Sequence, residues 1–107
     1  MVSDLNRLKE TFQRMEDDEF NTNLPLNWGY FFFDNDKVKL EKLYNELSSD
    51  YELISLEKVD SLEWKLYLQR IELLSPEGLH NRNKTFNELA EKYNVALYDG
   101  WDVEKLS

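Results

Sequence analysis

The sequence predicts an α+β fold, a ferredoxin-like βαββαβ sandwich with an extra N-terminal helix. Three observations lead to this prediction. The run Trp28–Asp34 holds five aromatic residues in seven, which is typical of a central strand. Apolar and polar residues alternate over residues 62–69, as in a strand with one buried face. Ser75-Pro76-Glu77 is a helix start that separates two strand-like segments.

The composition narrows the class of protein further. The chain has 107 residues, enough for one domain, and its lack of cysteine excludes disulfides and thiolate metal sites. It has neither the apolar run of a signal peptide nor the ~20 apolar residues of a membrane span, so we expect a cytoplasmic protein. The net charge of -9 disfavours nucleic acid and anionic lipid. It either favours a basic protein partner or only keeps the protein soluble.

The N-terminal segment predicts an amphipathic helix over residues 3–19, with Ser3 as its N-cap. Its apolar stripe consists of Leu5, Leu8, Phe12 and Met15. The acids at 16–19 indicate a solvated helix end, because a Ca²⁺ loop needs alternating ligands and a glycine turn. The predicted organisation is an N-terminal helix at 1–20, a linker at 21–27 and the main domain at 28–107.

The predicted central strand is apolar on both faces. Trp28, Tyr30 and Phe32 share one face, and Phe31 and Phe33 share the other. Such a strand needs a cover on each side. We therefore expect the two later helices on one face of the sheet and the N-terminal helix on the other.

The middle of the chain predicts a helix and two strands. The helix spans about 36–48, capped by Asp36 or Asn35, and its apolar stripe is Leu40, Leu43, Tyr44 and Leu47. A strand at 51–59 and a two-residue turn at Asp60-Ser61 lead into the strand at 62–69. The alternation then changes phase, which indicates either a β-bulge near Arg70 or the end of the strand.

The last third predicts a helix and a closing strand. Ser75 caps the helix, and Asn94 suits the left-handed position after its last turn. The strand covers residues 95–103, and Gly100 inside it indicates a bulge or a close backbone approach. A hairpin at Asp99-Gly100 is the competing interpretation.

The residues themselves indicate no catalytic chemistry. His80 is the single histidine, and the three glycines do not form a phosphate-binding loop. We expect no catalytic residue, no cofactor and no metal site, so a small hydrolase ranks last among the alternatives. RNA binding of the RNA-recognition-motif type is disfavoured too, because Leu66–Arg70 lacks that motif's basic, glycine-containing pattern.

Three segments together resemble the family called regulator of ribonuclease activity B (RraB). They are Trp28–Phe33, Leu73–Leu79 and Glu88–Trp101, the last ending in Tyr98-Asp99-Gly100-Trp101. The resemblance covers roughly residues 28–103 and implies a ferredoxin-like, RraB-type domain. It also implies an acidic, non-catalytic protein that binds the RNase E endoribonuclease of the RNA degradosome and restrains its cleavage of mRNA. Other members are thought to be immunity proteins against bacterial toxins, which is the alternative function.

The resemblance also directs attention to a partner-binding segment. We expect the partner to be a basic protein, an endoribonuclease or a toxin, with no direct contact to nucleic acid or membrane. The candidate binding residues are Tyr98, Asp99, Gly100, Trp101 and Asp102. The protein itself is expected to be a monomer or a weak homodimer.

Overall fold

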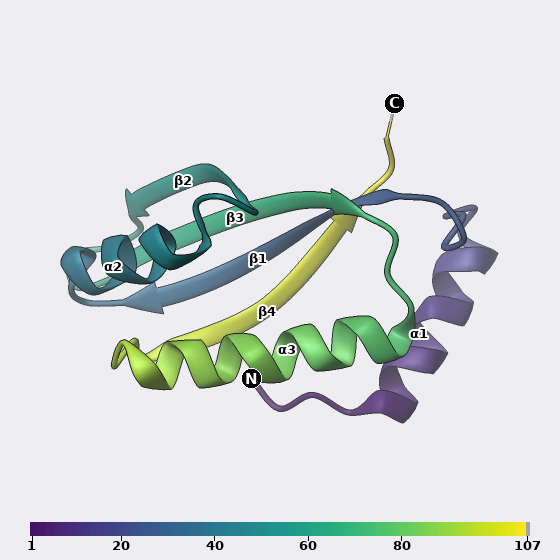
Figure 1. Cartoon of the computed structure of the whole chain (residues 1–107), viewed down its shortest axis with the longest axis horizontal. Coiled ribbons are helices and arrows are strands. Elements are labelled where there is room, and N and C mark those ends of the chain that lie inside the picture. The colour runs from purple at the N-terminus through teal and green to yellow at the C-terminus, as the bar shows by residue number, and fades with distance from the viewer. Residues whose placement is uncertain (107) are drawn as a thin grey trace.

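The computed structural model describes residues 1–106, so residue 107 of the predicted main domain lies outside the described residues. These residues form three helices and four strands (Figure 1). In chain order they are α1 (Leu5–Asp17), β1 (Leu26–Asp34), α2 (Lys37–Leu47), β2 (Glu52–Lys58), β3 (Trp64–Glu72), α3 (Pro76–Lys92) and β4 (Leu97–Glu104). The fold is therefore α+β. Because α1 precedes the first strand, the whole chain is not exactly a ferredoxin βαββαβ unit.

The four strands form one antiparallel sheet in the order β2-β3-β1-β4. The prediction that the first and third strands are central is confirmed. Strand β1 pairs with β3 over nine consecutive residues, from Leu26 opposite Glu72 to Asp34 opposite Trp64. Strands β2 and β4 are the two edges of the sheet.

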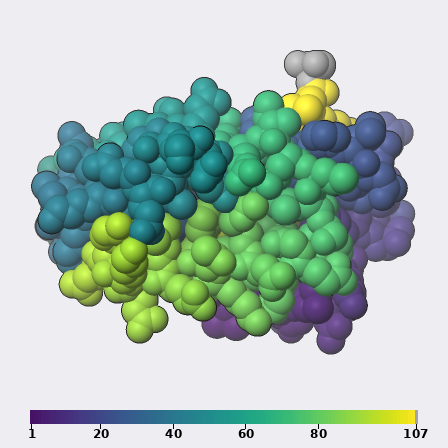
Figure 2. Space-filling view, viewed as in Figure 1, coloured from purple at the N-terminus to yellow at the C-terminus, as the bar shows by residue number. Residues whose placement is uncertain are grey.

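The core lies between one face of the sheet and the helices. Trp28, Tyr30 and Phe32 of β1 are at most 1% exposed on this face. Phe86 of α3 meets Tyr30 edge-on, with ring centroids 4.9 Å apart, and also contacts Phe32. In the view of Figure 2, atoms of α2 and α3 fill most of this side of the molecule. Each of these side chains leaves water completely, which stabilises the fold by roughly 1.5–3 kcal/mol per large apolar group.

The position predicted for the N-terminal helix is wrong. Helix α1 lies across one end of the sheet, beside the first turns of α3 (Figure 1). Its Phe12 stacks on Trp28 at 5.7 Å, on the same face that α3 covers. The second face of β1 carries Phe31 and Phe33, which are only partly buried. An amphipathic stripe shows that a helix needs an apolar neighbour, but it does not show which neighbour it takes.

Three local predictions also need correction. Asp4, not Ser3, caps α1, because its carboxylate accepts from the backbone N–H groups of Asn6 and Arg7. Strand β3 keeps an unbroken register with β1 to Glu72, so neither the bulge near Arg70 nor an end of the strand there exists. The change of phase arises because Ile71 is 60% exposed on the uncovered face.

The predicted two-residue turn at Asp60-Ser61 is wrong, because β2 ends at Lys58 and β3 begins only at Trp64, so five residues connect the two strands. Three other local predictions are confirmed. Asp36 caps α2, and Ser75 caps α3 with Pro76 in its first turn. Asn94 follows α3 with φ of 55°. Among residues 1–106, no helix combines the length and apolar character that a membrane crossing requires.

The packing of α1 leads to a prediction about stability. Phe12 is 6% exposed and stacks on Trp28, so Phe12→Ala should lower the free energy of unfolding by about 3–5 kcal/mol. The exposed neighbour Gln13 is the control, and Gln13→Ala should change it by less than about 0.5 kcal/mol. Urea denaturation followed by tryptophan fluorescence measures both. Equal stability of the two variants would contradict this placement of α1.

Candidate functional site

The five predicted partner-binding residues lie on the edge strand β4, and their exposure differs widely. Tyr98 is 1% exposed and Gly100 is also buried. Asp99 is exposed, and Trp101 and Asp102 are partly buried. Because Trp101 pairs with Tyr30 and Asp102 pairs with Gly29, these two side chains lie on opposite faces of the sheet. The segment therefore does not form one continuous patch.

Tyr98 fixes β4 to α3 from inside the protein. Its hydroxyl donates a 2.6 Å hydrogen bond to Oδ1 of the fully buried Asn83. Burial raises the pKa of the Tyr98 phenol above its ordinary value. The same Asn83 donates through Nδ2 to Ser3 Oγ, so the hydrogen bonds connect β4, α3 and the N-terminal segment.

Gly100 marks an irregularity in the pairing of β4 with β1. The register shifts between Phe31 and Phe32, and Gly100 has φ of +126°, a conformation that other residues rarely adopt. The predicted bulge is therefore confirmed, and the hairpin is not formed. The extra residue is Asp99, which is exposed at this edge of the sheet.

Trp101 lines a groove beside α1. Its ring lies 5.6 Å from that of Trp28 and closes one side of a cavity of about 470 Å³. Asp4, Arg7 and Thr11 are among the residues that line the same cavity. A partly exposed tryptophan beside a groove has the composition of an interface contact, although its packing on Trp28 also supports the core.

Asp102 belongs to a polar network on the uncovered face of the sheet. Both of its carboxylate oxygens accept from the Tyr67 hydroxyl, at 3.1 and 3.2 Å. Gln69 Nε2 donates to the same hydroxyl at 2.8 Å. Burial and the hydrogen bond to Asp102 raise the pKa of Tyr67, so the phenol stays neutral near pH 7.

Gly29 makes room for this network. A Cβ atom at this position would lie 2.1 Å from Asp102 Oδ1 and 2.6 Å from Tyr67 Cε1. Sequence reasoning missed both Tyr67 and Gly29 as members of the site. The signal was present, because a glycine interrupts an aromatic strand and a tyrosine occupies the wetter face of residues 62–69.

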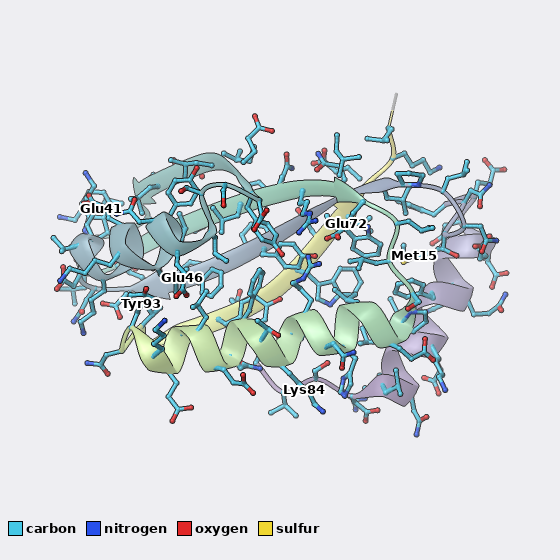
Figure 3. All side chains as sticks on the ribbon, in the orientation of Figure 1. Met15, Glu41, Glu46, Glu72, Lys84 and Tyr93 are labelled. Atoms are coloured by element: carbon cyan, nitrogen blue, oxygen red, sulfur yellow. The ribbon has the colours of Figure 1, made fainter. Side chains whose placement is uncertain are left out.

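A partly buried ion pair holds α3 against the sheet on the covered face. Arg82 donates to both carboxylate oxygens of Glu72, at 2.5 and 3.1 Å, and to the hydroxyl of Tyr30. Figure 3 shows Glu72 between the sheet and α3. Burial disfavours the charged guanidinium, but the hydrogen bond to Glu72 raises the pKa of Arg82 above its ordinary value. This pair is a structural element, because its groups already satisfy one another.

The remaining candidates for chemistry are structural as well. Ser3 Oγ lies 2.8 Å from Nδ1 of the partly buried His80 and also accepts from Asn83, so the contact fixes the N-terminal segment on α3. Within the described range 1–106, no group of three or more acidic or histidine side chains is placed to hold a metal ion.

The sequence matches a known protein family over most of its length. The sequence model of the family described as "Regulator of ribonuclease activity B" matches residues 6–103, which is most of the chain. The match includes nearly all of α1 and β4 and the network around Asp102. A search of curated proteins finds no match.

The two buried tyrosines of the core predict a loss of stability in alkali. Burial raises the pKa of Tyr30 and Tyr98 above their ordinary value of 10.0. The folded state therefore holds these protons more tightly than the unfolded state does. Their contribution should be complete below pH ~10 and should fall as the pH rises further.

Urea midpoints measured between pH 7 and pH 11 test this dependence. Tyr98→Phe should be less stable at pH 7 by about 1 kcal/mol, because Asn83 Oδ1 loses its donor. It should also lose less stability than the unmodified protein above pH ~10. An identical alkaline dependence in both proteins would contradict the assignment.

Proposed function

The chain belongs to the family of regulators of ribonuclease activity B, which are non-catalytic proteins that regulate RNase E by binding it, and we propose that it restrains mRNA cleavage by such an enzyme. The observation that carries this proposal is the family match over residues 6–103. The polar groups of His80 and of the partly buried Glu72–Arg82 pair are engaged in contacts within the chain. We further propose that it acts in the cytoplasm as a monomer or weak homodimer.

The β1–β4 part is best interpreted as a ferredoxin-like unit. After α1 the elements follow the order β-α-β-β-α-β, with β1 and β3 in the centre. We infer that α1 extends this unit by covering the end of its core at Trp28.

We place the contact with the ribonuclease on the segment Tyr98–Asp102. Asp99, Trp101 and Asp102 have solvent-accessible side chains and would contact the partner directly. Tyr98 and Gly100 are buried, and their proposed role is to hold the shape of the strand. Tryptophan is frequent among residues that dominate binding energy, which favours Trp101 as a contact on the side of β4 that faces α1.

The charge of the chain supports a basic partner. The net charge is -9, and acids gather at residues 16–19, 50–60 and 99–104. Such a field attracts a basic surface and increases the rate of productive encounter.

The direct test measures binding and inhibition with a purified endoribonuclease of the RNase E type. The full chain should bind it with a defined stoichiometry and slow cleavage of an mRNA substrate in proportion to the bound fraction. Cleavage that is unaffected at saturating concentrations, or an absence of binding at micromolar concentrations, would overturn the proposal.

The acids of β4 predict how association responds to salt. The double variant Asp99→Asn, Asp102→Asn should associate more slowly than the unmodified chain, because it presents fewer negative charges to a basic partner. For the unmodified chain, the association rate should fall about tenfold as salt rises from low ionic strength past ~0.15 M, where the Debye length is about 8 Å. Stopped-flow fluorescence measures both rates.

A charge-matched control separates local from global effects. Glu10→Gln with Glu88→Gln removes the same number of charges from the exposed faces of α1 and α3. This control should retain most of the association rate. Equal rates for both double variants would show that β4 is not where the partner approaches.

A further inference from the structure

The face of the sheet turned away from α2 and α3 carries a stacked aromatic pair. Phe31 of β1 lies directly opposite Tyr67 of β3. Their ring centroids are 4.4 Å apart and the ring planes differ by 5°. Both side chains are only partly buried, so the pair is accessible from this side.

Carboxylates flank the pair on both sides. The pairing registers place Asp102 and Glu104 of β4 and Glu52 and Glu57 of β2 on the same face as Tyr67. The single lysine at these sheet positions is Lys65, opposite Phe33. A face with four carboxylates and one ammonium group attracts a cationic ligand and repels nucleic acid.

The face already holds a cation of its own. The Nζ atom of Lys65 lies 5.2 Å from the centre of the Phe31 ring and 5.9 Å from that of Tyr67. This is the distance at which a cation is attracted to an aromatic ring. An ammonium group on a flexible stem is easily moved, so Lys65 marks where an incoming cation can lie.

The Tyr67 ring is held rigidly with an acceptor at its edge. Asp102 and Gln69 fix its hydroxyl, and the missing side chain of Gly29 leaves the space that this arrangement needs. A ring face next to a carboxylate suits a guanidinium, which stacks through its plane and donates through its edge. An ammonium group is not planar, so it cannot stack on the ring in this way.

We propose that this face, centred on Phe31, Tyr67 and Asp102, binds an arginine-bearing basic segment of the ribonuclease partner, with a guanidinium taking the place of the Lys65 ammonium. The identity of the partner rests on the function proposed above. The arginine chemistry rests on the geometry of the face alone. Single-stranded RNA and a second copy of the chain are the competing occupants.

Lys65 gives a test that separates the proposed occupant from RNA. Removing its charge should strengthen binding of an arginine-bearing segment and weaken binding of RNA. Binding of the full chain to an RNase E-type endoribonuclease is measured by calorimetry at constant salt. Lys65→Met should tighten binding about threefold or more, because the cation that competes for the rings is removed. The matched control Lys84→Met alters the exposed face of α3 by the same charge and should tighten binding less. Weaker binding by Lys65→Met, or equal effects of the two variants, would overturn the proposal.

Tyr67→Leu provides the second variant. It should weaken binding about tenfold while its circular dichroism spectrum stays native. If wild type instead binds an oligouridine probe and Lys65→Met weakens that binding, the face is for RNA and the proposal is wrong. If Tyr67→Leu alters only the sedimentation of the free chain, the occupant is a second copy and the proposal is likewise wrong.

A peptide experiment separates failure of this inference from failure of the proposed function. The labelled chain is titrated with a twelve-residue peptide of alternating arginine and serine (a probe of about six positive charges), and with its lysine counterpart. The arginine peptide should bind about fivefold tighter and shift the amide signals of Phe31, Tyr67 and Asp102. Equal affinities, or shifts confined to α2 and α3, would overturn the inference even if the ribonuclease binds elsewhere. If the arginine peptide binds at this face and the ribonuclease does not bind the chain, the inference about arginine binding stands and only the identity of the partner is wrong.

Discussion

Trp28, Tyr30 and Phe32 leave water together on one side of a strand whose two edges are both hydrogen-bonded. This one-sided burial is the constraint on which the rest of the structure depends. Because side chains alternate along a strand, it assigns Phe31 and Phe33 to the opposite face at the same time. The helices must then gather on the first side, and the second side is free to carry polar groups such as those around Tyr67.

The covered side is not purely apolar, and its polar groups orient the helices. Arg82 lies between the carboxylate of Glu72 and the rings of Tyr30 and Tyr51. A guanidinium in this position is favourable only when α3 is correctly placed along β3, because a misplaced charge would be buried without a partner. Asp34 has a comparable role at the other end, where it accepts from the backbone of Asp36 and Ala96 and joins two loops. The ion pair of Lys92 with Glu46 links α3 to α2 near Tyr93 (Figure 3).

Much of the fold could be predicted because its signals are local. The aromatic strand, the Ser75-Pro76 start and the left-handed Asn94 each follow from the preferences of a few neighbouring residues. The position of α1 could not, since its stripe fits any apolar surface and the choice of Trp28 depends on the assembled sheet. The hydrogen bond between Tyr67 and Asp102 could not be predicted for the same reason. The two residues are 35 positions apart in the sequence, and only the pairing of both strands with β1 brings them together. Asp102 was identified through family resemblance, whereas the residues that position it were not.

Gly29 meets a packing requirement of the outer face of the sheet that is independent of the packing of the core. The core depends on its neighbours Trp28 and Tyr30, whereas the space above Gly29 serves only Tyr67 and Asp102 on the surface. A relative with a side chain here can keep the same sheet and the same helices, but it must arrange its outer face differently. A side chain at this one position would thus change the outer face of the sheet without changing the fold.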